Sequence, residues 1–244
     1  MGIYDRDYYR NSNRPSAFGS FAPWTITTWL ICLHVFVFFA DRLSGGLLTQ
    51  FGYFSLMMGV FHFQIWRFIT YQVLHANLGH IFFNMLALYF FGPLVESVLG
   101  ARRYLAFYLL SGVGGALGYI ALFYSGILKF PGWSPLVGAS AGIFGVLIAG
   151  AMIAPDSTVM LWFPPIPMRL RTMAGLLLVI AVYTVLSNGE NAGGEAGHLG
   201  GALIGFLLIK NPRVLDLFDF RLPRGPNMRY RGRRVHDWRN DWNR

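Results

Sequence analysis

The sequence predicts an all-α integral membrane protein, a bundle of six transmembrane helices, and three observations favour this class. Of the 244 residues, 55% are hydrophobic and only 13% are charged, whereas a soluble domain carries about 25% charged residues. Aromatic residues make up 17% of the chain, as expected for rings that lie at both membrane interfaces. The apolar residues are gathered in six runs, which we expect to be the spans.

The six expected spans are Trp24–Ala40, Ile81–Leu99, Tyr104–Ile127, Gly138–Ala154, Thr172–Ser187 and Ala196–Ile209. A full crossing needs about 20 residues, and the fourth and sixth runs are short. We expect these two helices to be enclosed by protein or to border a water-filled cavity, because lipid cannot satisfy exposed backbone. Residues 41–74 are aromatic but too interrupted to span, so we expect a loop embedded in the outer interface.

The basic residues predict the orientation of the bundle. An even number of spans places both termini on one side, and this side then holds all but three of the 20 Lys and Arg residues. By the positive-inside rule this side is the cytoplasm. The expected organisation is a cytoplasmic N-terminal segment (1–23), a six-helix domain (24–210) and a basic cytoplasmic tail (211–244). The net charge of +9 is explained by topology and contact with anionic lipids, so we expect no nucleic-acid partner.

Ser140 lies in the sequence Gly-Ala-Ser-Ala-Gly at the start of the fourth span. In the first turn of a helix the backbone N–H groups have no intrahelical partner, and they favour negative charge nearby. A serine nucleophile there would carry its own oxyanion donor. Because serine is also common in helix-packing faces of membrane proteins, Ser140 alone does not predict catalysis.

His198 at the start of the sixth span changes this interpretation. It shares one helical face with Gly201 and Gly205, and glycines at four-residue spacing allow helices to approach closely. The fourth span offers small residues at the same spacing, so His198 can reach Ser140. No Asp or Glu is evidently placed to orient the imidazole, which predicts a dyad. Phe144, one turn beyond Ser140, is expected to stack on the ring and hold it.

A third polar group precedes and begins the second span. His80 and Asn84 share a helical face, and both can donate hydrogen bonds to an oxyanion. Asn77 is a candidate N-cap, and His75 is expected to hold the outer loop by hydrogen bonds. A His-x4-His pair also occurs in membrane di-iron enzymes, but those sites need more ligands and carboxylates. We therefore expect no metal and no cofactor.

These motifs, in this order and spacing, resemble the rhomboid family of intramembrane serine proteases, in its bacterial-type six-helix form. The resemblance runs from about residue 24 to 209. The matching residues are Trp66, Arg67, His75, His80, Asn84, Gly138, Ser140, His198, Gly201 and Gly205.

The resemblance implies a role for each group. Ser140 would be the nucleophile and His198 the general base of a dyad in a water-filled cavity that opens outward. His80 and Asn84 would form the oxyanion hole with the Ser140 N–H. The substrates would be transmembrane proteins that enter laterally beside the second and fifth spans. Trp66 and Arg67 would have a structural role in the membrane-embedded first outer loop.

Three further expectations concern residues near these motifs. Many family members have glycine directly after the serine and some have tyrosine stacked on the histidine, whereas this chain has Ala141 and Phe144. Glu96 is expected to pair with Arg102 or Arg103. The glycine-rich stretch 187–196 is expected to be a loop that acts as a mobile lid over the cavity.

Two other classes of function remain open at this point. A non-catalytic rhomboid-like binder or chaperone could use the same helix-recognition groove, and a small transporter could use a polar cavity. Neither needs a serine within reach of a histidine, which is why the protease hypothesis is preferred. The absence of a transit-like leader favours a bacterial inner membrane.

Overall fold

The structure is a computed structural model that describes residues 24–160 and 165–219. The predicted N-terminal segment 1–23 and residues 220–244 of the predicted tail lie outside the described residues.

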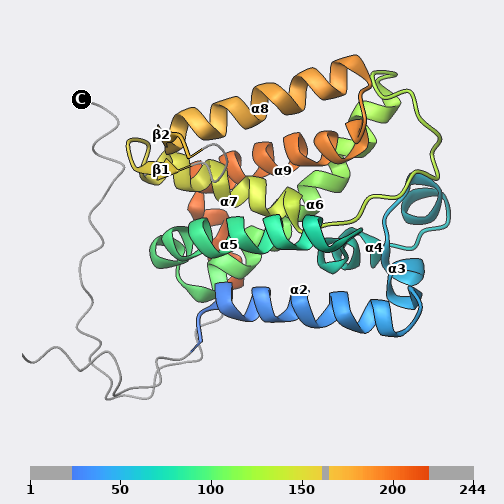
Figure 1. Cartoon of the computed structure of the whole chain (residues 1–244), viewed down its shortest axis with the longest axis horizontal. Helices are drawn as coiled ribbons and strands as arrows, with labels where there is room; N and C mark the ends of the chain where they lie inside the picture. The colour runs from blue at the N-terminus through green and yellow to red at the C-terminus, as the bar shows by residue number, and fades with distance from the viewer. Residues whose placement is uncertain (1–23, 161–164, 220–244) are drawn as a thin grey trace, which may run out of the picture.

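Six apolar helices form the bundle (Figure 1). They are α2 (Ile26–Leu43), α5 (Leu78–Leu99), α6 (Ala101–Tyr124), α7 (Ser140–Ile153), α8 (Leu170–Ser187) and α9 (Ala192–Lys210). Five of them are long and apolar enough to cross a membrane, and α7, with 14 residues, is shorter. In Figure 1, α2 and α8 lie at opposite edges of the bundle, with α7 and α9 between them. The predicted class, a helical membrane bundle, is confirmed.

The predicted boundaries were right for most helices and wrong for α9. This helix begins at Ala192, four residues before the expected start, and its 19 residues are enough for a crossing. The prediction stopped at Ala196 because Gly193 and Gly194 are weak helix formers and Glu195 is polar. Of the six bundle helices, only α7 is therefore shorter than a crossing needs.

The segment between α2 and α5 contains four short helical pieces, α3 (Leu47–Gly52), the π-helical turn η2 (Leu56–Phe61), α4 (Arg67–Thr70) and η3 (Tyr71–Val73). Arg67 is buried at its centre. Its guanidinium donates hydrogen bonds to the Tyr53 carbonyl at 2.6 Å, to the Gln50 carbonyl at 3.2 Å and to the Gln64 side chain at 2.6 Å. Trp66 is half exposed. We call residues 44–77 the outer segment.

The outer segment also holds the chain that leads into α7. Phe54 and Leu136 form an isolated antiparallel bridge, with N–H···O distances of 3.0 and 2.7 Å. The Gly138 N–H donates to the Tyr71 carbonyl at 2.9 Å. The backbone immediately before Ser140 is therefore fixed by residues far away in the sequence.

Glu96 does not have the partner that we expected. Its carboxylate accepts hydrogen bonds from the Ile26 N–H at 2.7 Å, the Thr27 N–H at 2.9 Å and the Thr27 hydroxyl at 2.7 Å. It thus satisfies free amides in the first turn of α2, where the helix dipole favours a negative charge. The expected pairing with Arg102 or Arg103 is replaced by a contact between α5 and α2.

Two small elements lie at the end of the bundle away from the outer segment (Figure 1). Strands β1 (Thr158–Met160) and β2 (Pro167–Arg169) form an antiparallel pair between α7 and α8. The 3₁₀ helix η4 (Pro212–Phe218) follows α9, and its Leu215 is fully buried. Arg103 of α6 pairs with Asp216 at 2.7 Å. The first residues of the predicted tail are thus folded against α6.

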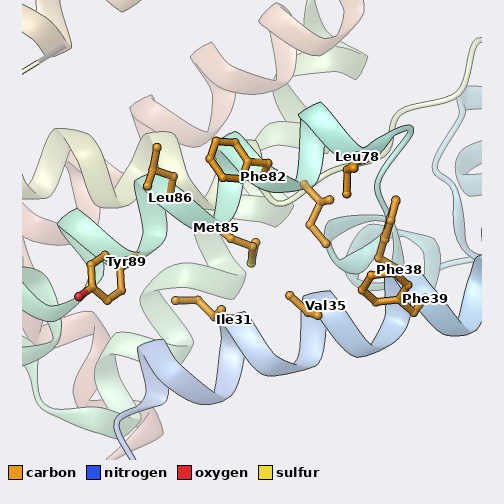
Figure 2. Close-up of a pocket in the computed structure, with 10 residues that line it drawn as sticks. Ile31, Val35, Phe38, Phe39, Leu78, Phe82, Met85, Leu86 and Tyr89 are labelled. Atoms are coloured by element: carbon orange, nitrogen blue, oxygen red, sulfur yellow. The ribbon is translucent and has the colours of Figure 1, made fainter. Parts of the chain in front are cut away.

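A groove of about 350 Å³ runs between α2 and α5 (Figure 2). Apolar side chains line it, among them Val35 and Phe39 from α2 and Phe82 and Met85 from α5. Figure 2 shows these side chains reaching from both helices into the space between them. The middle of the α2–α5 contact is therefore loosely packed.

Candidate active site

Ser140 is the first residue of α7 and is half-buried. Two residues earlier, Gly138 has φ +132°, a conformation that side chains other than glycine rarely adopt. A Cβ on Gly138 would lie 2.8 Å from Nε2 of His80 and 3.5 Å from Oγ of Ser140. Both the positive φ and the lack of room for a side chain therefore require glycine at position 138. This residue lies next to His80 and Ser140.

The glycines of α9 bring its backbone against α6 and α7, and we call this contact the glycine seam. A Cβ on Gly201 would collide with the Ala141 carbonyl oxygen, and one on Gly205 with the Gly145 backbone. On the α6 side, a Cβ on Gly200 would collide with a backbone carbonyl oxygen. The close approach expected from the glycine spacing is present, and it lies next to the first turn of α7.

The His198 ring is held from two directions. It stacks on Phe144 with ring centroids 4.2 Å apart and planes 9° from parallel. Its Nδ1 lies 2.8 Å from Oε2 of Glu195, so the carboxylate accepts a hydrogen bond from Nδ1–H. Because Phe144 lies one turn beyond Ser140 on the same face of α7, the stacked ring lies about one helical turn from Ser140. Nε2 is then the ring nitrogen left for a serine.

Within the described residues, no hydrogen bond joins the Ser140 hydroxyl to His198. Catalytic hydrogen bonds are often long in the absence of substrate and shorten when it binds. The structure therefore brings the two elements together without forming the bond itself.

His80 and Asn84 lie on α5, with His80 facing Gly138. The Asn77 side chain accepts from the His80 N–H at 2.8 Å, which confirms Asn77 as the N-cap of α5. The Ala76 N–H donates to His80 Nδ1 over a long 3.4 Å, so in the neutral ring the proton is on Nε2. Asn84 is buried, and its amide donates to the His80 carbonyl at 3.0 Å, which leaves its second N–H hydrogen free for another acceptor.

Comparisons with known proteins agree with this arrangement. Residues 62–210 match the family model described as the Rhomboid domain. The chain is 31% identical over 192 residues to Rhomboid protease GluP of Bacillus subtilis, and this match covers 75% of the chain and 34% of that protein. This chain belongs to the rhomboid family.

Two other rhomboid proteins show similar identity. RHOMBOID-like protein 1 of Arabidopsis thaliana is 30% identical over 73% of the chain and 43% of its own length. Rhomboid protease AarA of Providencia stuartii is 28% identical over 75% of the chain and 70% of its own length. The chain thus spans about a third of the Bacillus protein and less than half of the Arabidopsis one.

His75 of this rhomboid packs against two other histidines, a contact that the sequence did not predict. His75 is buried, and neither ring nitrogen has a hydrogen-bond partner among the described residues. Its ring instead contacts His34 and His80 edge-on, with centroids 5.4 and 5.2 Å away. Burial, together with the neighbouring His34 and His80, lowers the pKa of His75 to about 3, so the ring is neutral at physiological pH. His75 supports the outer segment by packing.

The connection that we predicted to act as a lid is shorter than expected. The second half of the stretch 187–196 belongs to the first turns of α9, and only 188–191 connect α8 to α9. Asn188 anchors this connection, since its side chain accepts from the Lys129 N–H at 2.7 Å and donates to the Ile127 carbonyl at 2.9 Å.

Two residues near the site were missed from the sequence. Glu195 was assigned to the loop, although its spacing of three residues from His198 would place both on one helical face. His34 was noted only as a histidine within the first span. It is fully buried, and its Nε2 lies 3.0 Å from the Tyr108 hydroxyl. A histidine inside an apolar span was the available signal.

The described residues contain no cluster of three or more potential metal ligands.

Proposed function

We propose that this rhomboid is an intramembrane serine endopeptidase that hydrolyses peptide bonds in or near the transmembrane segments of membrane proteins. The observation that carries the proposal is the stack of His198 on Phe144, one turn from Ser140 on the same face of α7. A serine in the first turn of α7 and an imidazole stacked one turn further along the same helix are the parts that acyl transfer needs.

In the proposed reaction, the Ser140 hydroxyl oxygen attacks the scissile carbonyl carbon while His198 Nε2 takes its proton. The tetrahedral intermediate collapses, the C–N bond breaks, and the imidazolium returns the proton to the leaving amine. Water then hydrolyses the acyl-enzyme by the same steps, with His198 as general base. Ser140 and His198 are both half-buried rather than sealed, which supports access of water to the site.

The negative charge on the carbonyl oxygen would be met by three donors. The Ser140 backbone N–H is in the first turn of α7, where amides have no intrahelical acceptor. The Nε2–H of His80 and the second amide hydrogen of Asn84 are the other two, and both come from one face of α5. Removal of one such donor typically lowers the rate by about 10²–10³.

The proposed substrates are transmembrane proteins, and the proposed surroundings are membrane lipids. A helical substrate hides its carbonyls in hydrogen bonds, so it must unwind locally at the cut. We propose that it enters beside α5 and α8. We also propose a bacterial inner membrane with both termini in the cytoplasm and the site open to the outer side. The ion pairs of Arg103 and Arg169 with Asp216 and Asp156 lie at the end that would be cytoplasmic, which supports this orientation.

One observation favours a second candidate, a non-catalytic rhomboid-like binder or chaperone. Within the described part of the chain, Ser140 is not hydrogen-bonded to His198. A binder would use the same helix-recognition surface without needing this contact. The experiment must therefore report on the serine itself.

The experiment is labelling with a fluorophosphonate probe together with cleavage of a model transmembrane substrate, using purified protein in liposomes. We expect the wild type to label and cut, Ser140→Ala to do neither, and His198→Ala to label far more slowly. Labelling that survives in Ser140→Ala would reject the assigned nucleophile. A wild type that neither labels nor cuts would favour the binder.

A further inference from the structure

The His198 ring is paired with a carboxylate from its own helix. Glu195 and His198 are three residues apart on α9, and Oε2 lies 2.8 Å from Nδ1. Both side chains are largely buried, with 19% and 14% of their surface exposed. Water competes little for a hydrogen bond to a carboxylate that is shielded in this way.

The backbone of α9 itself places Glu195. It lies in the first turn of α9, where the helix dipole favours a negative charge. Its own N–H donates to the Asn191 carbonyl at 3.0 Å, so its backbone is already helical. The carboxylate therefore comes from a rigid element and not from the loop in which we expected it.

Stacking and hydrogen bonding restrain different motions of the His198 ring. The contact with Phe144 fixes the plane of the ring but leaves it able to turn within that plane. A hydrogen bond to Nδ1 fixes this rotation and also fixes the tautomer, because the proton must be on Nδ1. Nε2 is then unprotonated and free to accept the serine proton.

We propose that Glu195 is a positioning residue for His198, holding Nδ1–H so that Nε2 faces Ser140 and stabilising the imidazolium that forms during the reaction. The inference rests on the proposed function. It replaces the expected dyad with a serine, a histidine and a carboxylate, the carboxylate acting only through the histidine.

The other groups that face His198 do not provide this charge. His80 on α5 is a titratable neighbour, and α7 offers Ser140 and Phe144. Where α6 meets α9, the contact consists largely of glycines and apolar residues. Among the residues that the structure describes, Glu195 is the carboxylate hydrogen-bonded to this ring.

The test compares Glu195→Gln with Glu190→Gln in the full-length protein. Glu190 is exposed and lies in the connection just before α9, so both changes remove one negative charge close to the same helix end. The readouts are the rate of fluorophosphonate labelling of Ser140 against pH, kcat and KM for a transmembrane substrate, and the midpoint of thermal unfolding.

We expect Glu195→Gln to lower kcat and the labelling rate by about 10- to 100-fold, the loss found when the hydrogen-bond partner of a metal-bound imidazole is removed. KM should stay unchanged, because Glu195 does not touch the substrate. The acid limb of the labelling profile should move to lower pH, because the imidazolium has lost its counter-charge. Glu190→Gln should match the wild type in all readouts.

Three outcomes would overturn the inference. One is a Glu195→Gln protein that matches Glu190→Gln in rate and pH profile. Another is a slower enzyme with an unmoved acid limb and a lower unfolding midpoint, which would make Glu195 merely structural. A wild type that does not label at any pH would reject the proposed function and the role of Glu195 with it. This last failure is distinguishable because it occurs without any substitution.

Discussion

The glycine seam and the α2–α5 contact hold neighbouring helices together in opposite ways. In the seam, Gly201 and Gly205 let the backbone of α9 touch that of α7 without side chains between them. Between α2 and α5, large apolar side chains surround a groove of about 350 Å³. The α2–α5 contact is instead secured at one end, by the bonds from Glu96 to the first turn of α2.

The two contacts differ in how far they can adjust to added atoms. A backbone-to-backbone contact cannot adjust to added atoms, because interiors are close-packed and the main chain has no alternative rotamer. A groove lined by flexible side chains can adjust, because those side chains can change rotamer. The proposed catalytic residues Ser140 and His198 lie beside the rigid contact, so their geometry depends on atoms that cannot move out of the way.

The largest effect is expected from one added carbon in the seam. Gly201→Ala places a methyl group against the Ala141 carbonyl oxygen, which must push α9 away from α7. We expect a loss of about 3 kcal/mol in unfolding free energy, at the upper end for overpacking, and no fluorophosphonate labelling. Unfolding of the purified protein in detergent micelles measures the loss.

The matched control is Gly175→Ala on α8, where an added Cβ meets no atom within 4 Å. Alanine is the better helix former by about 1 kcal/mol, so this variant should be as stable as the wild type or more so. Equal destabilisation by the two alanines would contradict the comparison, since it would mean that the seam is no tighter than the lipid-facing surface.

An intermediate effect is expected from Glu96→Ala. Loss of the carboxylate leaves the amides of Ile26 and Thr27 without their acceptor, and hydrogen bonds to charged groups are worth about 1.5–3 kcal/mol each. Because these hydrogen bonds are only partly buried, water can replace some of the lost interaction. We expect about 2 kcal/mol lower stability, measured as a lower unfolding midpoint. An unchanged midpoint would show that the groove side chains alone hold α2.

The smallest effect is expected from one added carbon in the groove. Val35→Ile keeps the branched side chain and adds a methyl group where Figure 2 shows open space between α2 and α5. Lipid is as apolar as the side chain, so the unfolding free energy should change by less than about 0.5 kcal/mol. A loss of unfolding free energy as large as that of Gly201→Ala would mean that the groove cannot accommodate an added methyl group.

The sequence predicted the parts of this fold that depend on local pattern. The apolar runs located all six helices, and the glycine spacing anticipated the approach of Gly201 to Ala141. The true partner of Glu96 could not be found in this way, because it is about 70 residues distant and depends on how α5 packs against α2. Glu195 was missed for a different reason. Helix propensity argued against a helix through Gly193 and Gly194, and tertiary packing overrode it.

The seam also has a consequence for how the protein is made. His198 follows Ser140 by 58 residues, which at about 5–20 residues per second takes a ribosome roughly 3–12 s. During this interval the glycine faces of α6 and α7 await α9, and the serine has neither its histidine nor Glu195. A newly made chain therefore enters the membrane with the proposed site incomplete, and α9, which follows the other five bundle helices in chain order, completes it.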